Sequence, residues 1–347
     1  MKLVADKLVA KCLGSLPKRQ QDVLEGRCGL KNGREMTLAA LGSRYGVTRE
    51  RIRQIQNLSL DEIRSRAAEN GLDGFVQLLS AHMDSVGGLR EQSMLVSDLA
   101  HLLEDGGDKK TFANRVKFLL EASDKVAFHP ADKDFHAFWY VDDSSLKKAS
   151  GFISSLAKSL SGNKEAVLAG KKFDEHFKDA AKLCSVSEII GSNYVAASKK
   201  FMSNHFGDVG LSAWPEINPK TSRDFAYLVI KKEGQPLHFT TIAERINNVR
   251  KNKKTNFQTV HNELIKDARF VLVGRGVYGL EEFGIMAGTA REVMAELLKK
   301  HGPQRSRDLV KLVLEKRMFK ENTLLLNLQN KSHFKRTDDG RYFLKEV

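Results

Sequence analysis

The chain has 347 residues, of which 41% are hydrophobic and 29% are charged, and its net charge is +14. This length exceeds one ordinary core and indicates two or more domains, and the charge favours a polyanionic partner such as nucleic acid. No apolar run approaches the roughly 20 residues of a membrane span, and the start lacks the apolar stretch of a signal peptide, so we expect no membrane contact and a cytoplasmic location.

The charge is unevenly distributed along the chain. Residues 1–72 hold 14 basic and 8 acidic side chains, whereas residues 73–144 hold 7 basic and 13 acidic ones. The segments that follow, 145–219, 220–286 and 287–347, are basic again. Basic blocks suit repeated contact with a polyanion. The acidic block argues instead for a protein contact or a spacer.

The first 70 residues have helical periodicity. Apolar residues recur at helical spacing between residues 3 and 13, and a second helix runs through Val23 and Leu24 to an end near Gly29. Residues 37–57, TLAALGSRYGVTRERIRQIQN, then predict two short helices joined by a tight turn. Apolar side chains fall on the inner side of both helices: Leu38, Leu41, Tyr45, Val47, Ile52 and Ile55.

Two glycines and a threonine give this segment the pattern of a helix-turn-helix. Gly42 is small where the two helices must cross closely, and Gly46 occupies a turn position that needs a left-handed backbone. Thr48 can cap the second helix. These offsets predict a DNA-reading helix-turn-helix. The alternative is an amphipathic helical hairpin with a solvated charged face.

The outward face of the second helix carries side chains suited to base recognition. Arg49 can bond a guanine edge, Glu50 can accept from cytosine, and Gln54 can pair with adenine. We expect these three residues to read bases in double-stranded DNA. The residues expected to contact phosphates or neighbouring groups are Thr48, Arg51 and Arg53.

The same residues resemble a known family. GVTRERIRQIQ, with TLAALGSRYG before it, is similar to region 4 of housekeeping sigma factors, and LPKRQQDVLEGRCGL at 16–30 looks like the preceding subregion. The resemblance covers residues 16–66. It implies recognition of a promoter −35 element and packing on the β flap of the RNA polymerase core. Gln20 and Cys28 depart from the family pattern, outside the reading helix.

After residue 71 a repeated pattern of helices followed by strand pairs begins. Runs rich in aromatic and β-branched residues predict strand pairs at 126–141, 269–283 and 333–347, and a weaker single strand at 209–217 that includes Trp214. Helices closed by a hairpin are typical of the winged form of helix-turn-helix. Generic α+β modules are the alternative.

We therefore predict a mainly α-helical fold with small β-hairpin wings, arranged as a multidomain tandem array of helix-turn-helix and winged-helix modules. The predicted domains are 1–72 (region 4-like), 73–144 (an acidic winged-helix-like module), 145–219 (a helical middle module), 220–286 (a winged helix) and 287–347 (a C-terminal winged-helix-like module).

Residues 221–284 resemble the HARE-type winged helix-turn-helix, a family that includes the N-terminal domain of the RNA polymerase δ subunit. The matching features are Pro236 to Phe239 leading into a helix, Arg269-Phe270, and the run from Gly274 to Leu280. Cations stand before the third helix and at the wing tip, where they fit phosphate contacts or a solvated loop: Arg250, Lys251, Lys253, Lys254 and Arg275.

No motif indicates catalysis or a bound metal. Cys12, Cys28 and Cys184 lie far apart, without a CxxC or a Cys/His pair at zinc spacing. The sequence lacks a phosphate-binding loop, HExxH, GxSxG and a supported pair of carboxylates. We expect no catalytic residues, no metal, no cofactor and no enzymatic activity.

Together these features predict a sequence-specific DNA-binding transcription regulator that acts near promoters, with RNA polymerase as a second partner. One alternative is a δ-like accessory protein that works mainly through protein contacts. Another is a DNA-binding subunit of a restriction or defence system. We do not expect a complete sigma factor, because no aromatic-rich promoter-melting domain precedes the region 4-like segment.

Overall fold

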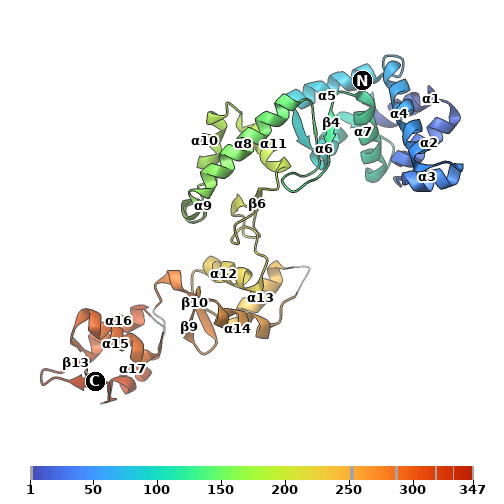
Figure 1. Cartoon of the computed structure of the whole chain (residues 1–347). Helices are drawn as coiled ribbons and strands as arrows, with labels where there is room; N and C mark the ends of the chain where they lie inside the picture. The colour runs from blue at the N-terminus through green and yellow to red at the C-terminus, as the bar shows by residue number, and fades with distance from the viewer. Residues whose placement is uncertain (1–2, 251–253, 286–287, 317–318, 331, 346–347) are drawn as a thin grey trace. The chain divides into compact units, whose positions relative to one another are not determined.

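The computed structural model describes residues 3–250, 254–285, 288–316, 319–330 and 332–345. The chain divides into two compact units, Met1–Ser203 with Gly207–Ala213, and Asn204–Phe206 with Trp214–Val347. Both units consist mainly of helices with small, mostly antiparallel sheets, which confirms the predicted fold class (Figure 1). No helix within the described ranges is long and apolar enough to cross a membrane. The five predicted domain ranges stay predictions.

Four helices form the N-terminal part of the first unit: α1 (Ala5–Gly14), α2 (Lys18–Cys28), α3 (Leu38–Tyr45) and α4 (Arg49–Ser65). α2 ends at Gly29, whose left-handed backbone (φ 62°) lets its amide bond the carbonyl of Glu25. The helices α2, α3 and α4 share a small core of their own, made by Val23, Leu41, Ile52 and Ile55.

The next segment has the strand order of a winged helix. α5 (Leu72–Ser85), β2 (Leu89–Glu91), α6 (Gln92–Leu102) and α7 (Lys109–Ser123) are followed by a hairpin of β4 (Ala127–His129) and β5 (Phe138–Tyr140). The sheet order is β2-β5-β4, because β5 pairs with both other strands in antiparallel register. This hairpin is the one predicted at 126–141.

One hydrophobic core joins the helix-turn-helix part to this first winged module. Leu8 of α1 and Leu24 of α2 are buried in the same cluster as Leu119 of α7. A short parallel pairing of β1 (Leu3–Val4) with β3 (Leu103–Glu104) ties the start of the chain to the same module. Two segments of opposite net charge are therefore held together by shared apolar burial.

A helical part completes the first unit: α8 (Asp143–Ser161), α9 (Lys164–Gly170), α10 (Phe173–Leu183), α11 (Glu188–Ala197) and the hairpin of β6 (Phe201–Ser203) and β7 (Val209–Leu211). The Asn193 side-chain amide donates to the carbonyl of Val86 at 2.7 Å, and the Tyr194 hydroxyl donates to that of Gly87 at 2.7 Å. These bonds satisfy buried polar groups and fix α11 against the loop before β2.

The weaker strand predicted at 209–217 is wrong in its second half. β7 ends at Leu211, and Trp214 lies in an irregular segment with its ring buried. The amides of Ile217 and Asn218 both donate to the carbonyl of Trp214, at 3.0 and 2.9 Å, so the chain turns there. Pro215 has no amide hydrogen for a strand ladder, so this position also disfavours a strand.

The second unit repeats the winged-helix plan twice. The first copy comprises α12 (Ser222–Glu233), β8 (Leu237–His238), α13 (Phe239–Val249), α14 (Phe257–Lys266), β9 (Phe270–Gly274), β10 (Val277–Leu280) and the 3-10 helix η1 (Glu281–Phe283). The second comprises α15 (Ala290–His301), β11 (Gln304–Arg305), α16 (Ser306–Lys316), α17 (Glu321–Leu328), β12 (Phe334–Arg336) and β13 (Arg341–Leu344). Their sheet orders, β8-β10-β9 and β11-β13-β12, match that of the first unit's wing.

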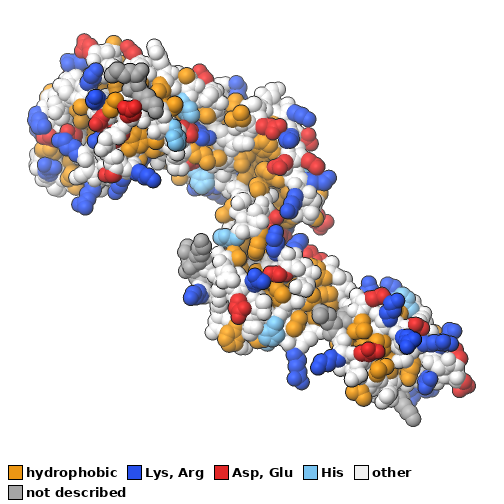
Figure 2. Space-filling model, turned by 180° about the vertical axis from the view of Figure 1, so that it is seen from behind, with side chains coloured by type: hydrophobic (Ala, Val, Ile, Leu, Met, Phe, Trp, Pro, Cys, Tyr) orange, Lys and Arg blue, Asp and Glu red, His pale blue; other side chains and the backbone are white. Residues whose placement is uncertain are grey.

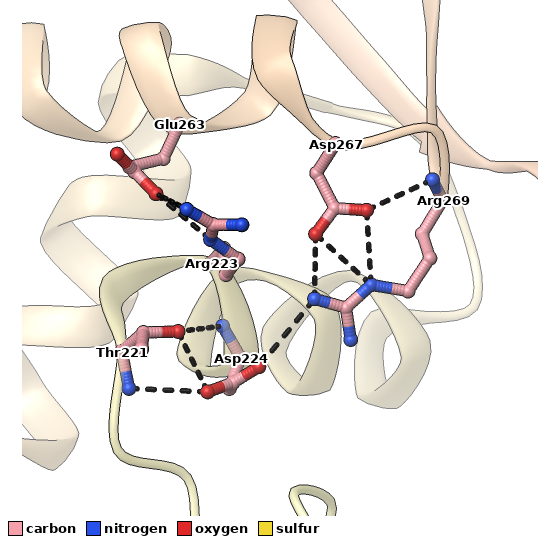
Figure 3. A network of polar contacts seen from close by, with 6 residues as sticks. All are labelled: Thr221, Arg223, Asp224, Glu263, Asp267 and Arg269. Atoms are coloured by element: carbon pink, nitrogen blue, oxygen red, sulfur yellow. Dashed lines mark hydrogen bonds and ion pairs between the residues drawn. The ribbon is translucent and has the colours of Figure 1, made fainter.

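A polar network joins α12 to α14 and to the start of β9 (Figure 3). Arg269 donates to both carboxylate oxygens of Asp267, with a shortest contact of 2.7 Å, and to Asp224 of α12 at 3.4 Å. Four residues before Asp267, Glu263 of α14 accepts a hydrogen bond from Arg223 of α12 at 2.9 Å. The network therefore fixes the third helix of this module against the first.

The two aspartates of this network have lowered pKa values. Hydrogen bonds from Arg269 are the main reason why the pKa of Asp267 lies below its usual 3.8. Burial raises the pKa of Asp224, but hydrogen bonds from Thr221 and Arg269 outweigh burial and leave that pKa lowered as well. Both carboxylates are therefore stabilised in their charged form by the folded structure.

Replacing Leu119 by Ala is expected to lower the free energy of unfolding by about 2–5 kcal/mol, because its side chain lies in the core shared by the helix-turn-helix and the first wing. Urea unfolding followed by circular dichroism measures the loss. The matched control is Leu58→Ala on α4, where the side chain is 57% exposed and the change should stay within about 0.5 kcal/mol. Equal effects of the two variants would refute the shared core.

Replacing Arg269 by Gln is expected to make the free energy of unfolding of the second unit depend less on pH in the acidic range. Both aspartate pKa values lie below 3.8, so their stabilising contribution is complete above that pH and is lost as pH falls through the lower folded values. Without the guanidinium, burial raises both pKa values and weakens this contribution, although Thr221 still donates to Asp224. Urea unfolding at a series of acidic pH values tests this, with the exposed Arg305→Gln as control. An unaltered pH dependence in Arg269→Gln would contradict the assignment.

Candidate nucleic-acid interface

The helix-turn-helix consists of α3, a short turn and α4. Thr37 caps α3 by accepting a hydrogen bond from the amide of Ala40, and Thr48 caps α4 by accepting from the amide of Arg51 at 3.2 Å. Between the helices, Gly46 has a φ of 64°, a left-handed conformation that glycine adopts at little cost. The turn therefore has the geometry that its sequence predicts.

Gly42 lets α3 approach this turn closely. A Cβ added here would lie 2.7 Å from the carbonyl oxygen of Val47, a backbone atom that cannot rotate away. The amide of Val47 donates to the carbonyl of Gly42 at 2.9 Å and so closes the turn over the glycine. The absence of a side chain at Gly42 is thus a packing requirement of the motif.

Burial divides α4 into two faces. Ile52 and Ile55 lie in the small core with Leu41, which fixes the rotation of the helix about its axis. The opposite side presents polar residues that are all exposed: Arg49, Glu50, Arg51, Arg53 and Gln54. The fold therefore brings the predicted base-reading and phosphate-contacting residues to the solvent-facing side of one helix. Their role in DNA recognition stays a prediction.

The exposed side chains of α4 pair with one another. Arg53 donates to both carboxylate oxygens of Glu50, with a shortest contact of 2.7 Å, and Arg51 donates to the amide oxygen of Gln54 at 3.1 Å. The hydrogen bond from Arg53 lowers the pKa of Glu50 and favours its charged form. Arg49 makes no side-chain hydrogen bond or ion pair with any residue that the structure describes. Base contacts at Glu50 and Gln54 would replace existing pairs, whereas Arg49 starts without one.

The third helix of the first winged module is buried against the helix-turn-helix part. α7 packs on α1 and α4, and 9 of its 15 residues are buried. Arg115 extends the contact by bonding Asp105 at 2.7 Å and the carbonyl of Leu30 at 3.2 Å. α7 therefore cannot enter a DNA groove in this arrangement. The sequence held a signal for it, the consecutive apolar residues 118–120, because a helix with one solvated face alternates more regularly.

Residues 12–65 match the family described as Sigma-70, region 4. They form a sigma-70 region 4 domain. The predicted range of 16–66 agrees with it to within a few residues at each end. The region 4 domain covers only the N-terminal part of the chain, and the HARE-type resemblance of residues 221–284 stays a prediction.

Several sigma factors are similar to a short part of the chain. The RNA polymerase principal sigma factor HrdD of Streptomyces griseus is 41% identical over 61 residues, 18% of each chain. The RNA polymerase sigma factor SigA of a Bacillus species is 42% identical over 65 residues, 19% of this chain and 17% of its own length. SigA of Listeria monocytogenes matches over the same share. The chain thus spans less than a fifth of the length of these relatives.

The cations predicted to contact phosphate in the second unit are seen in part. Lys251 and Lys253 lie outside the described residues. Lys254 is exposed before α14, and Arg275 is exposed at the tip between β9 and β10. Figure 2 shows Lys and Arg side chains spread over the visible face and intermingled with acidic ones. Phosphate contact at Lys254 and Arg275 stays a prediction.

Arg250 has a structural contact that the sequence did not predict. Its guanidinium lies 4.8 Å from the centre of the Phe225 ring, and it donates to the Thr255 hydroxyl at 3.2 Å. A cation over an aromatic face is attracted to it. Arg250 therefore bonds Thr255 just before α14 and contacts α12, and a phosphate contact would compete with these interactions.

α14, the third helix of its module, exposes apolar side chains that sequence reasoning missed. Phe257 is 52% exposed and Ile265 is 64% exposed. Apolar side chains on such a helix can contact thymine methyl groups or a protein surface. Their exposure distinguishes α14 from the first turns of α4, where the exposed residues 49–51, 53 and 54 are polar.

Replacing Gly42 by Ala is expected to destabilise the chain by about 1–3 kcal/mol, because the new methyl group would collide with the Val47 carbonyl. The control is Gly14→Ala at the end of α1, where an added Cβ would meet no atom within 4 Å from the rest of the described chain outside its own helix. That variant should be neutral or slightly stabilising, since Ala favours helix over Gly. Denaturant unfolding measures both, and a neutral Gly42→Ala would show that the turn is looser than described.

Proposed function

We propose that this chain is a sequence-specific DNA-binding transcription regulator whose α4 recognises a promoter-like duplex. The observation that supports it best is the exposed polar face of α4 within a sigma-70 region 4 domain. The buried Ile52 and Ile55 hold that face outward in a fixed rotation. In this proposal the chain acts by binding, without catalysis and without a cofactor.

The proposed recognition divides the side chains of α4 by their chemistry. Arg49 donates two hydrogen bonds to a guanine edge, Glu50 accepts one from cytosine, and Gln54 forms hydrogen bonds with adenine. Phosphate contacts then set the register of the helix in the major groove. The residues proposed for these are Thr48, Arg51 and Arg53, with Lys254 and Arg275 of the second unit as further, sequence-independent contacts.

The proposal includes RNA polymerase as a second partner. Its support is that the relatives of the region 4 domain are named RNA polymerase sigma factors. α7 already covers the inner faces of α1 and α4, so a polymerase contact would use the outward surfaces of α2 and α3. Lys18 and Arg19 of α2 are exposed, whereas Gln20, the departure from the family pattern, is half-buried beside them.

A second candidate function is a δ-like accessory protein that works mainly through protein contacts. The exposed Phe257 and Ile265 on α14 favour it, because apolar and aromatic side chains are enriched at the centres of protein interfaces. The buried third helix of the first winged module agrees with it too, since that helix is used for packing. Co-purification with core polymerase in the absence of DNA would favour this candidate over direct DNA reading.

The test is a fluorescence anisotropy titration of the full chain with two labelled duplexes, one carrying a −35 promoter element and one with that element scrambled. The double variant Arg49→Ala/Gln54→Ala should lose about 1–3 kcal/mol of promoter affinity for each bidentate contact removed, which is roughly tenfold or more. Its affinity for the scrambled duplex should change little, since phosphate contacts dominate there.

The control is Lys7→Ala, which removes one positive charge from an exposed position on α1, outside the helix-turn-helix. This variant should bind both duplexes slightly more weakly than the wild type, and by the same factor. The proposal fails if the wild-type chain binds the two duplexes equally well, or if the double variant retains wild-type discrimination between them.

A further inference from the structure

The sheet of the third winged module has one face turned away from the core of that module. Tyr342 and Leu344 of the central strand β13 pack on this core, and Phe334 of β12, which pairs with Leu344, is buried in it. Side chains along a strand point alternately to the two faces of a sheet. Arg341 and Phe343 of β13 therefore point to the opposite side, which we call the outer sheet face.

The strand register adds two cations to the outer sheet face. Lys335 of β12 pairs with Phe343, and Arg305 of β11 pairs with Arg341. Residues that lie directly opposite each other in antiparallel strands have their side chains on the same face. The outer sheet face therefore carries one half-buried aromatic ring, Phe343, among three exposed cations, Arg305, Lys335 and Arg341.

The cations of the outer sheet face are available to an anionic partner. The side chains of Arg305 and Lys335 make no hydrogen bond or ion pair with any residue that the structure describes. Arg341 pairs with Asp339 of the β12–β13 turn at 3.1 Å, but both side chains are more than half exposed. An ion pair so exposed contributes little to stability, so a phosphate can take the place of the carboxylate.

The second winged module provides a comparison, because β9 and β10 pair from Tyr278 to Leu280 in the register that β12 and β13 have from Tyr342 to Leu344. Both modules have a phenylalanine, a tyrosine and a leucine at the inner positions: Phe270, Tyr278 and Leu280 in the second, Phe334, Tyr342 and Leu344 in the third. The inner faces of the two sheets therefore serve the same packing.

The outer positions of the two sheets differ in their chemistry. In the second module Val271 stands at the position of Lys335, and Gly279 stands at that of Phe343. A Cβ added to Gly279 would lie 2.5 Å from Cδ1 of Ile285, so the chain itself covers the sheet there. The fold therefore requires neither a lysine nor an aromatic ring at these positions, which favours a binding role for Lys335 and Phe343.

We propose that the outer sheet face binds single-stranded DNA. Bases stack on Phe343, because every base has a flat aromatic face, and phosphates lie against the three cations around the ring. A duplex cannot use the ring in this way, since its bases are already stacked inside the helix and only its phosphates reach the sheet. The choice of DNA over RNA rests on the proposed function, whereas stacking and charge do not depend on α4.

The test is a fluorescence anisotropy titration of the full chain with a labelled thymidine strand of about 12 nucleotides, a length that single-strand-binding folds cover. An abasic strand of the same length keeps the phosphates and lacks the bases, so the wild type should bind it more weakly. Phe343→Leu keeps an apolar side chain but removes the ring. This variant should bind the thymidine strand roughly fivefold or more weakly and the abasic strand as before, whereas Phe343→Tyr should bind both as the wild type does.

Lys335→Ala should also weaken binding of the thymidine strand. The slope of log affinity against log salt concentration should fall in magnitude by about 0.7, because one phosphate contact is lost. The matched control is Lys300→Ala, which removes the same charge from an exposed position on α15. The control should leave the affinity and the slope nearly unchanged.

The double variant Arg49→Ala/Gln54→Ala separates this proposal from the proposed function. It should bind the thymidine strand as the wild type does, whether or not it loses affinity for the promoter duplex. The proposal is overturned if the abasic strand binds as tightly as the thymidine strand, if Phe343→Leu binds the thymidine strand normally, or if Lys335→Ala and Lys300→Ala have equal effects. It is also overturned if a uridine RNA strand of the same length binds about tenfold more tightly than the DNA strand.

Discussion

The packing of α7 against α1 and α4 is the contact on which the first unit depends. It supplies much of the core that the helix-turn-helix cannot make alone, since Val23, Leu41, Ile52 and Ile55 form only a small cluster. A helix held firmly on its inner side can present a defined outer side. The acidic segment is thus an internal support of the region 4 domain.

The same topology occurs in three modules of this chain, but the third helix differs in its exposure from one module to the next. Three modules share the order helix, strand, helix, helix, hairpin, with the last strand in the middle of each sheet. The third helix is buried in the first module, exposes Phe257 and Ile265 in the second, and exposes Leu326 in the third. Fold alone therefore does not say what each module binds, and the side chains of the third helix have to be considered one module at a time.

Local constraints made the helix-turn-helix predictable from sequence. Gly42, Gly46 and Thr48 each act on neighbours only a few residues away in the sequence. Their spacing is therefore enough to predict the motif. The short strands β2, β8 and β11 were not predicted, because each is defined only by pairing with a distant hairpin. The burial of α7 depends likewise on contacts such as that of Arg115 with Leu30, which no local pattern records. The pairing of Glu50 with Arg53 depends on rotamers, which spacing permits but does not determine.

The pairing of β1 with β3 has a consequence for how the protein is made. Leu3 pairs with Leu103, so during synthesis Leu3 finds its partner only after about a hundred further residues have been added. At the usual pace of synthesis, those hundred residues take about 5–20 s to add. During that interval the side chains of α1 and α2 that pack against α7 lack that part of their core. The core of the region 4 domain is therefore complete only once the acidic segment that follows it has been synthesised.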